Sequence, residues 1–174
     1  GAYELDFILP RPQGAMQPLA GFGEDGQRTA GLFSQVGEHR GTVTVGEPVI
    51  LTVNVEDISE RDTTDPRFLE PIAIGVEFSK YQGPGMVAFE HHESTAIPEN
   101  PYKEGDRRFR FFREITPGQV KVEGGSGLAK TIATFSEPGE YMIHTKIDNF
   151  AGPDSSNGDQ CCWTNIVQKV TVSP

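Results

Sequence analysis

The chain has 174 residues with a formal net charge of −10, and 36% of its residues are hydrophobic. This length fits one domain with a core of its own, and no apolar run approaches the roughly 18 residues that a membrane-spanning helix needs. The acidic balance argues against binding to nucleic acid or to anionic lipid, both of which favour a strongly basic protein surface.

Short strands joined by turns are predicted for most of the chain. The 20 glycines and 13 prolines interrupt the sequence every few residues, which suits strands and turns rather than long helices. Period-two alternation of apolar and polar residues predicts strands at 3–9, 48–57, 69–78, 85–93, 107–115, 128–136, 139–148 and 165–173. A series of this kind indicates an all-β fold, an Ig-like antiparallel β-sandwich preceded by an N-terminal strand.

The alternation also assigns side chains to the core. Val53, Tyr141, Ile143 and Val170 fall on the inward phase of their segments, so we expect them to be buried together.

Residues 107–115 (RRFRFFREI) are predicted to form a further core strand. The alternation places Phe109 and Phe111 inward and leaves Arg108 and Arg110 on an outer, basic face. Docking of a carboxylate-rich partner on that face is the functional alternative.

Residues 10–40 lack this pattern. They contain three prolines and six glycines, and a seventh glycine follows at position 41. A connection this long in a compact domain is either functional or ordered against a sheet. We therefore expect an N-terminal strand and a long irregular connection over 1–41, packed on a sandwich of 42–174, with one domain overall.

Two segments resemble bacterial Ig-like or PKD-like modules. Residues 42–57 (TVTVGEPVILTVNVED) are similar to the short strand, glycine turn and long B strand of that family. Residues 135–148 (FSEPGEYMIHTKID) are similar to its F strand, and 165–173 follow as the closing strand. The resemblance implies that Tyr141 is the corner tyrosine that bonds back to the backbone. It implies an architecture and does not specify a function.

Residues 138–144 (PGEYMIH) also resemble a segment of the copper-binding cupredoxins, another β-sandwich family. A blue-copper site needs two histidines and one cysteine, but neither cysteine of this chain precedes a histidine. His144 also alternates out of phase with Tyr141 and Ile143, so we expect it to point away from the core.

Cys161 and Cys162 are adjacent and are the two cysteines of the chain, which excludes a long-range disulfide within it. We expect a vicinal disulfide beside Trp163, with free thiols or intermolecular bonds as the alternatives. The fold type and composition place the protein outside the cytoplasm, as a secreted, periplasmic or cell-surface protein.

An acidic loop after residue 148 supplies oxygen atoms that suit calcium, the one cofactor that the sequence suggests. The candidate ligands are Asp57, Asp148, Asp154, Asn157 and Asp159. The EF-hand spacing is not met, and surface turns use the same residue types, so a solvated loop is the alternative.

His91 and His92 could hold one transition-metal ion only at a strand end, because adjacent residues on a strand face opposite sides. Ordinary surface histidines are the alternative. In an Ig-like sandwich the loops after 48–57, 85–93 and 139–148 share one end. The candidate binding residues at that end are His91, His92, Cys161, Cys162 and Trp163.

The sequence therefore indicates a non-catalytic extracellular binding or adhesion module, with a protein or carbohydrate partner at the shared loop end. No G-x-S-x-G, phosphate-loop or H-E-x-x-H motif supports catalysis. Three alternatives stay open. One is a sandwich that binds calcium, copper or zinc, and another is a structural subunit that forms a homo-oligomer through residues 3–9. The third is an accessory domain of a larger enzyme.

Overall fold

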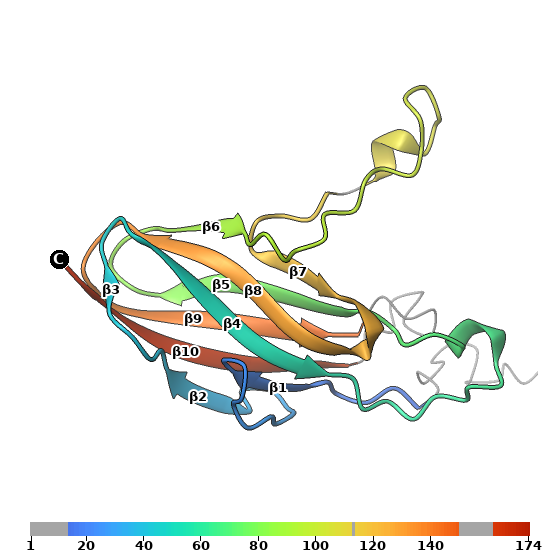
Figure 1. Ribbon diagram of the computed structural model, residues 1–174, viewed down its shortest axis with the longest axis horizontal. Coiled ribbons are helices and arrows are strands. Elements are labelled where there is room, and N and C mark those ends of the chain that lie inside the picture. The colour runs from blue at the N-terminus through green and yellow to red at the C-terminus, as the bar shows by residue number, and fades with distance from the viewer. Residues whose placement is uncertain (1–13, 113, 150–161) are drawn as a thin grey trace, which may run out of the picture.

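The computed structural model describes residues 14–112, 114–149 and 162–174. Within these ranges the strands form two sheets packed face to face (Figure 1). The first sheet has the order β1-β4-β8-β6. Its strands are β1 (Leu19–Phe22), β4 (Pro48–Glu56), β8 (Ser126–Phe135) and β6 (Val87–His91).

The second sheet has the order β2-β10-β9-β5-β7, with β3 also paired to β10. Its strands are β2 (Gln35–Glu38), β10 (Trp163–Ser173), β9 (Gly139–Asp148), β5 (Ile74–Gln82), β7 (Gln119–Val122) and β3 (Val43–Thr44). Pairings between the described strands are antiparallel, except that β2 and β3 run parallel to β10. The fold is the all-β, Ig-like sandwich that the sequence predicts.

Helical structure is confined, in the described ranges, to three short 3-10 turns. They are η1 (Pro66–Phe68), η2 (Phe109–Phe111) and η3 (Glu123–Gly125). No helix among the residues that the structure describes is long and apolar enough to cross a membrane.

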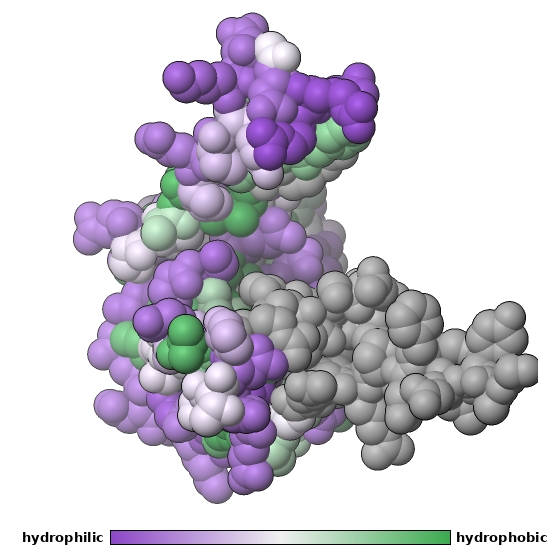
Figure 2. All heavy atoms as spheres, turned by 90° about the vertical axis from the view of Figure 1, so that its right-hand side faces the viewer, coloured by the Kyte–Doolittle hydropathy of each residue, from purple (hydrophilic) through white to green (hydrophobic). Residues whose placement is uncertain are grey.

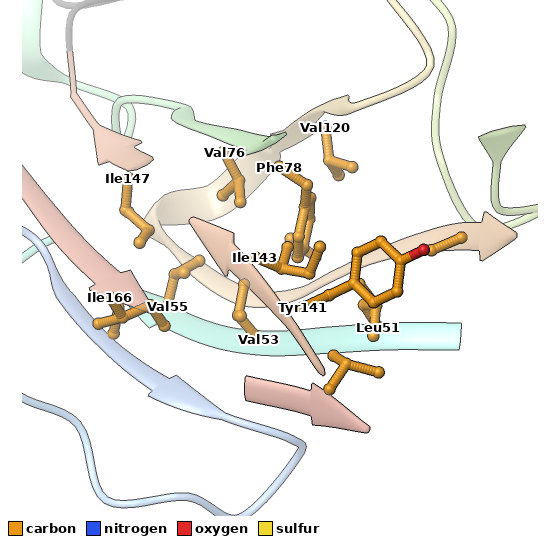
Figure 3. Close-up of a cluster of buried hydrophobic side chains, with 14 of the residues drawn as sticks. Leu51, Val53, Val55, Val76, Phe78, Val120, Tyr141, Ile143, Ile147 and Ile166 are labelled. Atoms are coloured by element: carbon orange, nitrogen blue, oxygen red, sulfur yellow. The ribbon is translucent and has the colours of Figure 1, made fainter. Parts of the chain in front are cut away.

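The core lies between the two sheets and is built from the inward phase of the strands. Figure 3 shows side chains of β4, β5 and β9 pointing toward one another across this space. Val53, Tyr141, Ile143 and Val170 are each at most 1% exposed, so their predicted burial is confirmed. Removing such apolar side chains from water is the main favourable term in folding.

Tyr141 has the corner role that the resemblance implies. Its hydroxyl donates a hydrogen bond to the Glu137 carbonyl oxygen at 2.8 Å and accepts one from the Gly85 amide at 3.0 Å. Its ring meets that of Phe135 edge-on, with the centroids 4.7 Å apart. The tyrosine thus fastens the turn before β9 to the β5–β6 connection, while its ring fills the core.

Five predicted strands agree with β4, β6, β8, β9 and β10 to within two residues at each end. The segment 69–78 is only partly right, because β5 begins at Ile74. Pro71 has no N–H to donate to a ladder, and the chain before Ile74 instead forms a loop that contains η1.

The predicted core strand at 107–115 is wrong. Residues 92–118, which we name the arm, leave the sandwich between β6 and β7, project from it in Figure 1, and carry mostly hydrophilic side chains in Figure 2. Phe109 and Phe111 lie there in η2 and are 39% and 58% exposed.

Local interactions in the arm explain the error. The Asp106 carboxylate accepts a hydrogen bond from the Arg108 amide at 2.8 Å, which starts a tight turn. The guanidinium groups of Arg108 and Arg110 then cover the rings of Tyr102 and Phe111, at 4.4 and 4.9 Å from the ring centroids. Arg108 and Arg110 therefore make cation–π pairs with aromatic rings at the surface, and the segment does not form a strand with a core face.

The irregular N-terminal connection contains two strands that sequence reasoning missed. β1 adds to the first sheet through β4, and β2 adds to the second through β10. Each has four residues, and glycine interrupts both, so neither shows alternation over enough positions to be detected. The predicted strand at 3–9 lies outside the described residues.

Candidate functional site

Asp57, the candidate metal ligand at the end of β4, lies in a buried network. It forms an ion pair with Arg61 at 2.7 Å, and these two side chains are only 6% and 7% exposed. The other carboxylate oxygen accepts bonds from the Ser59 hydroxyl at 2.5 Å and the Asn149 amide at 3.3 Å. A cation at Asp57 would therefore have to displace the guanidinium of Arg61.

Asn149 extends this network across the loop end. Its side chain is fully buried; the amide nitrogen donates to the Met16 carbonyl at 3.0 Å, and the oxygen accepts from the Cys162 amide at 3.0 Å. Four segments that are distant in the sequence are thus tied together by satisfied polar groups. This part of the predicted binding end has a structural role in the fold.

The other proposed calcium ligands are not gathered in the described structure. Asp148 pairs with Lys146 at 3.3 Å, and Asp154, Asn157 and Asp159 lie outside the described residues. Within the described ranges no group of three or more histidine, cysteine, aspartate or glutamate side chains is placed to hold a metal ion. The calcium hypothesis depends on the loop that is not described.

The structure does not bring the histidine doublet to this end. His91 is opposite Thr131 on β8, whereas Glu56 at the loop end is opposite Ser126. Five residues of strand correspond to about 17 Å. The expected gathering of His91 and His92 with Asp57 is therefore not found.

The cysteine doublet is described only in part. Cys162 is 7% exposed and its sulfur lies 3.7 Å from the Ala15 carbonyl oxygen. Trp163 begins β10 and is 36% exposed. Cys161 lies outside the described residues, so the vicinal disulfide stays a prediction.

His144 points away from the core, as its phase predicts. One ring nitrogen lies 2.9 Å from the Asn165 amide oxygen and the other 3.4 Å from the Ser79 hydroxyl. Neither neighbour is a ligand of a cupredoxin copper site. The trio has the residue types of a hydrolase triad, but it lies on the outer face of the second sheet and does not line the cleft described next. We assign it no catalytic role.

A cleft of about 600 Å³ opens where β1 ends, and sequence reasoning missed it. β1 pairs with β4 only from Val53 to Glu56, and at Gly23 the chain turns away from the sheet. The turn 23–27 forms one wall, and β2 with residues 39–40 forms the other. Figure 1 shows β1 and β2 side by side along this edge of the sandwich.

Amide side chains hold both walls in place. Gln35 of β2 donates to the carbonyl oxygens of Ala20 at 3.1 Å and Gln27 at 2.6 Å. Asn54 of β4 donates to the carbonyl oxygens of Gly23 at 2.9 Å and Gly26 at 3.2 Å. The walls are thus fixed by hydrogen bonds that make the cleft a preformed feature of the fold.

An apolar contact fixes the two walls against each other. The ring of Phe22 lies so close to Gly37 that a Cβ atom there would come within 2.6 Å of it. A side chain at residue 37 would therefore have to displace the ring of Phe22.

Gln168 is the most informative residue of the lining. It lies on β10 between Ile166 and Val170, in the inward phase of the strand, and is only 8% exposed. Its side-chain amide makes no hydrogen bond with any residue that the structure describes. It lines the open cleft, so its polar atoms face the solvent there and are available to a ligand.

The charged residues of the lining differ in their partners. Lys130 bonds to Glu24 at 2.8 Å and lowers the pKa of that carboxyl group, mainly through the hydrogen bond. Lys169 lies 3.9 Å from Glu38. Burial lowers the pKa of His39, which favours the neutral form of its ring.

Asp25 and Arg40 remain as the two charges of the lining without an ion pair among the described residues. They lie on opposite walls, in the turn 23–27 and just after β2. The cleft thus combines a buried amide, apolar surface from Phe22 and Ile50, and one unpaired charge of each sign. This combination suits binding and offers no nucleophile with a base.

No family model and no curated protein matches this chain. Among solved structures it is similar to WR4, an MSP family member of C. elegans, at 11% identity and a TM-score of 0.35, over 76% of this chain and 91% of that one. It is similar to PapD-like domain 7 of human CEP192 at 12% identity and a TM-score of 0.39, over 94% and 88%.

The N-terminal domain of PorA is similar at 14% identity and a TM-score of 0.43, over 88% of this chain and 97% of that domain. Likenesses of this size carry no inference about function, and they show no PKD-type relationship. The class of the fold rests on the two sheets and their topology: the chain is an Ig-like β-sandwich.

Proposed function

We propose that this chain is a non-catalytic binding module and that its ligand occupies the cleft between the turn 23–27 and β2. The observation that carries the proposal is the buried amide of Gln168, which opens on the cleft without a partner among the described residues. A ligand in the cleft could exchange hydrogen bonds with this amide without displacing a partner within the described protein.

The size and rigidity of the cleft support the proposal. Its volume of about 600 Å³ falls in the range of small-molecule sites, which are commonly preformed. Its lining is more polar than that of most such sites, which favours a polar ligand. The predicted loop end is a weaker candidate for the binding site, because the polar atoms of Asp57 and Asn149 already form hydrogen bonds within the protein.

The proposal also places the protein outside the cytoplasm, as a secreted, periplasmic or cell-surface protein. The composition, rich in glycine and proline and acidic overall, and the adjacent cysteines support this location. A domain that recognises a ligand without transforming it suits such a setting.

Replacing Gln168 with leucine tests the proposed function. Leucine fills a similar volume without polar atoms, so we expect the variant to be as stable as the parent or more so, while ligand binding weakens about tenfold through loss of one hydrogen bond to the ligand. Saturation-transfer NMR with a panel of free amino acids, sugars and sugar acids at millimolar concentration measures the binding.

The exposed Gln82 at the end of β5 provides the matched control, and Gln82→Leu should leave binding unchanged. Equal binding by the parent and the Gln168→Leu variant would overturn the proposal. Failure of every probe to bind the parent would overturn it as well.

A further inference from the structure

We propose that the ligand of this cleft is zwitterionic: a free α-amino acid or a short peptide whose carboxylate pairs with Arg40 and whose ammonium group pairs with Asp25. The inference rests on the proposed function, and it adds the chemical class of the ligand.

Two carboxylates of the cleft lining, Glu24 and Glu38, already have cations near them. Glu24 is held by Lys130 at 2.8 Å. Glu38 lies 3.9 Å from Lys169, whose ammonium group also pairs with Glu140 at 2.5 Å. Each of these two carboxylates of the lining thus has a cation within 4 Å, although Glu38 shares its cation.

Two other charged residues of the lining, Asp25 and Arg40, have no ion partner of this kind among the described residues. Both side chains are exposed, and neither has an ion pair within the described structure, with each other or with a third group. A ligand that carries one charge of each sign can neutralise both at once. The planar guanidinium group is suited to a carboxylate, which it can bind through two parallel hydrogen bonds.

A ligand with a single charge suits this pair of residues less well than a zwitterion does. The chain has a net charge of −10, which disfavours an anion in its field, and an anion at Arg40 would also face the unpaired Asp25. A cation at Asp25 would face Arg40 in the same way. A molecule without net charge but with separated charges meets neither penalty.

The remaining lining fits the rest of such a ligand. The Gln168 amide can donate to or accept from a peptide group or a polar side chain, and Phe22 and Ile50 offer apolar contact. Burial lowers the pKa of His39, which favours its neutral form, whereas Arg40 is always charged.

The test compares ligands and variants in pairs. From a panel of free α-amino acids and glycine dipeptides, isothermal titration selects the best binder, which is then measured as its N-acetyl and its C-terminal amide forms. We expect each blocked form to bind the parent at least about tenfold more weakly, as loss of one charge-assisted bond implies.

Variants locate the two effects. In the Asp25→Asn variant, N-acetylation of the ligand should cost little further affinity, because the partner of the ammonium group is already gone. In the Arg40→Gln variant, amidation of the carboxylate should likewise cost little further affinity. Arg107→Gln on the arm, which does not line the cleft, is the matched control and should behave as the parent does. If blocking the ligand's amino or carboxyl group costs the same affinity in the parent and in both variants, the assignment of Asp25 and Arg40 to these two groups is overturned.

Glucuronate and glucose separate this inference from the proposed function. If either binds in a Gln168-dependent way while no zwitterion binds, the inference fails and the binding module stands. If no probe of any class binds, both fail.

Discussion

Replacing Ile143 with alanine is expected to lower the free energy of unfolding by about 2–5 kcal/mol. The side chain is 1% exposed at the centre of β9 and packs between the two sheets (Figure 3). Truncation removes the transfer free energy of the lost carbons and leaves a cavity that a sandwich paired on both sides of β9 cannot close. Urea unfolding followed by tryptophan fluorescence measures the change.

Ile97 on the arm is the matched control, because it is 55% exposed. Ile97→Ala should change the free energy of unfolding by less than about 0.5 kcal/mol, as is usual at exposed positions. If the two variants lose the same stability, the assignment of Ile143 to the core is wrong.

Replacing Arg61 with alanine is expected to cost about 3–5 kcal/mol, because it leaves the buried carboxylate of Asp57 without its cation. Both side chains are nearly inaccessible, at 7% and 6% exposure. Arg61 also lies over the ring of Phe68, 5.8 Å from its centroid, so packing is lost together with charge. Chemical denaturation measures the loss.

A double variant separates charge from packing. Asp57→Asn combined with Arg61→Met removes both charges and keeps most of the volume, so it should recover part of the loss. Arg108→Ala, which breaks an exposed ion pair with Asp106, should have no measurable effect. A cost for Arg61→Ala no larger than that of Arg108→Ala would contradict a structural role for the Asp57 network.

The sandwich could be predicted because its long strands alternate. β4 carries a branched apolar residue at every second position, and β9 has Tyr141, Ile143, Thr145 and Ile147 on its inward phase. This alternation predicted their bounds and their inward faces. Tyr141 could be assigned because the resemblance ties its role to a short motif in the turn before β9.

The arm was mispredicted because alternation does not distinguish a core face from a surface pair. Phe109 and Phe111 have the right spacing for a strand, but Asp106 starts a turn and arginine covers the ring of Phe111. Their exposure follows from these contacts, which a period-two pattern does not record.

The cleft could not be predicted because its walls come from short segments that pair with distant strands. β1 and β2 have four residues each, and their positions are set by β4 and β10. One signal was present in the sequence. Gln168 is an amide in the inward phase of a strand whose neighbouring positions are Ile166 and Val170, and such a residue indicates either a buried partner or a site.

The central claim is that the cleft is the ligand-binding surface of this module, and amide chemical shifts test it most directly. A ¹⁵N-labelled sample is titrated with the best-binding free amino acid and followed in heteronuclear correlation spectra. The account predicts that the side-chain amide of Gln168 and the backbone amides of the turn 23–27 and of β2 shift together along one binding curve. Shifts confined to the loop end around Asp57 and Trp163, with the Gln168 amide unmoved, would contradict it.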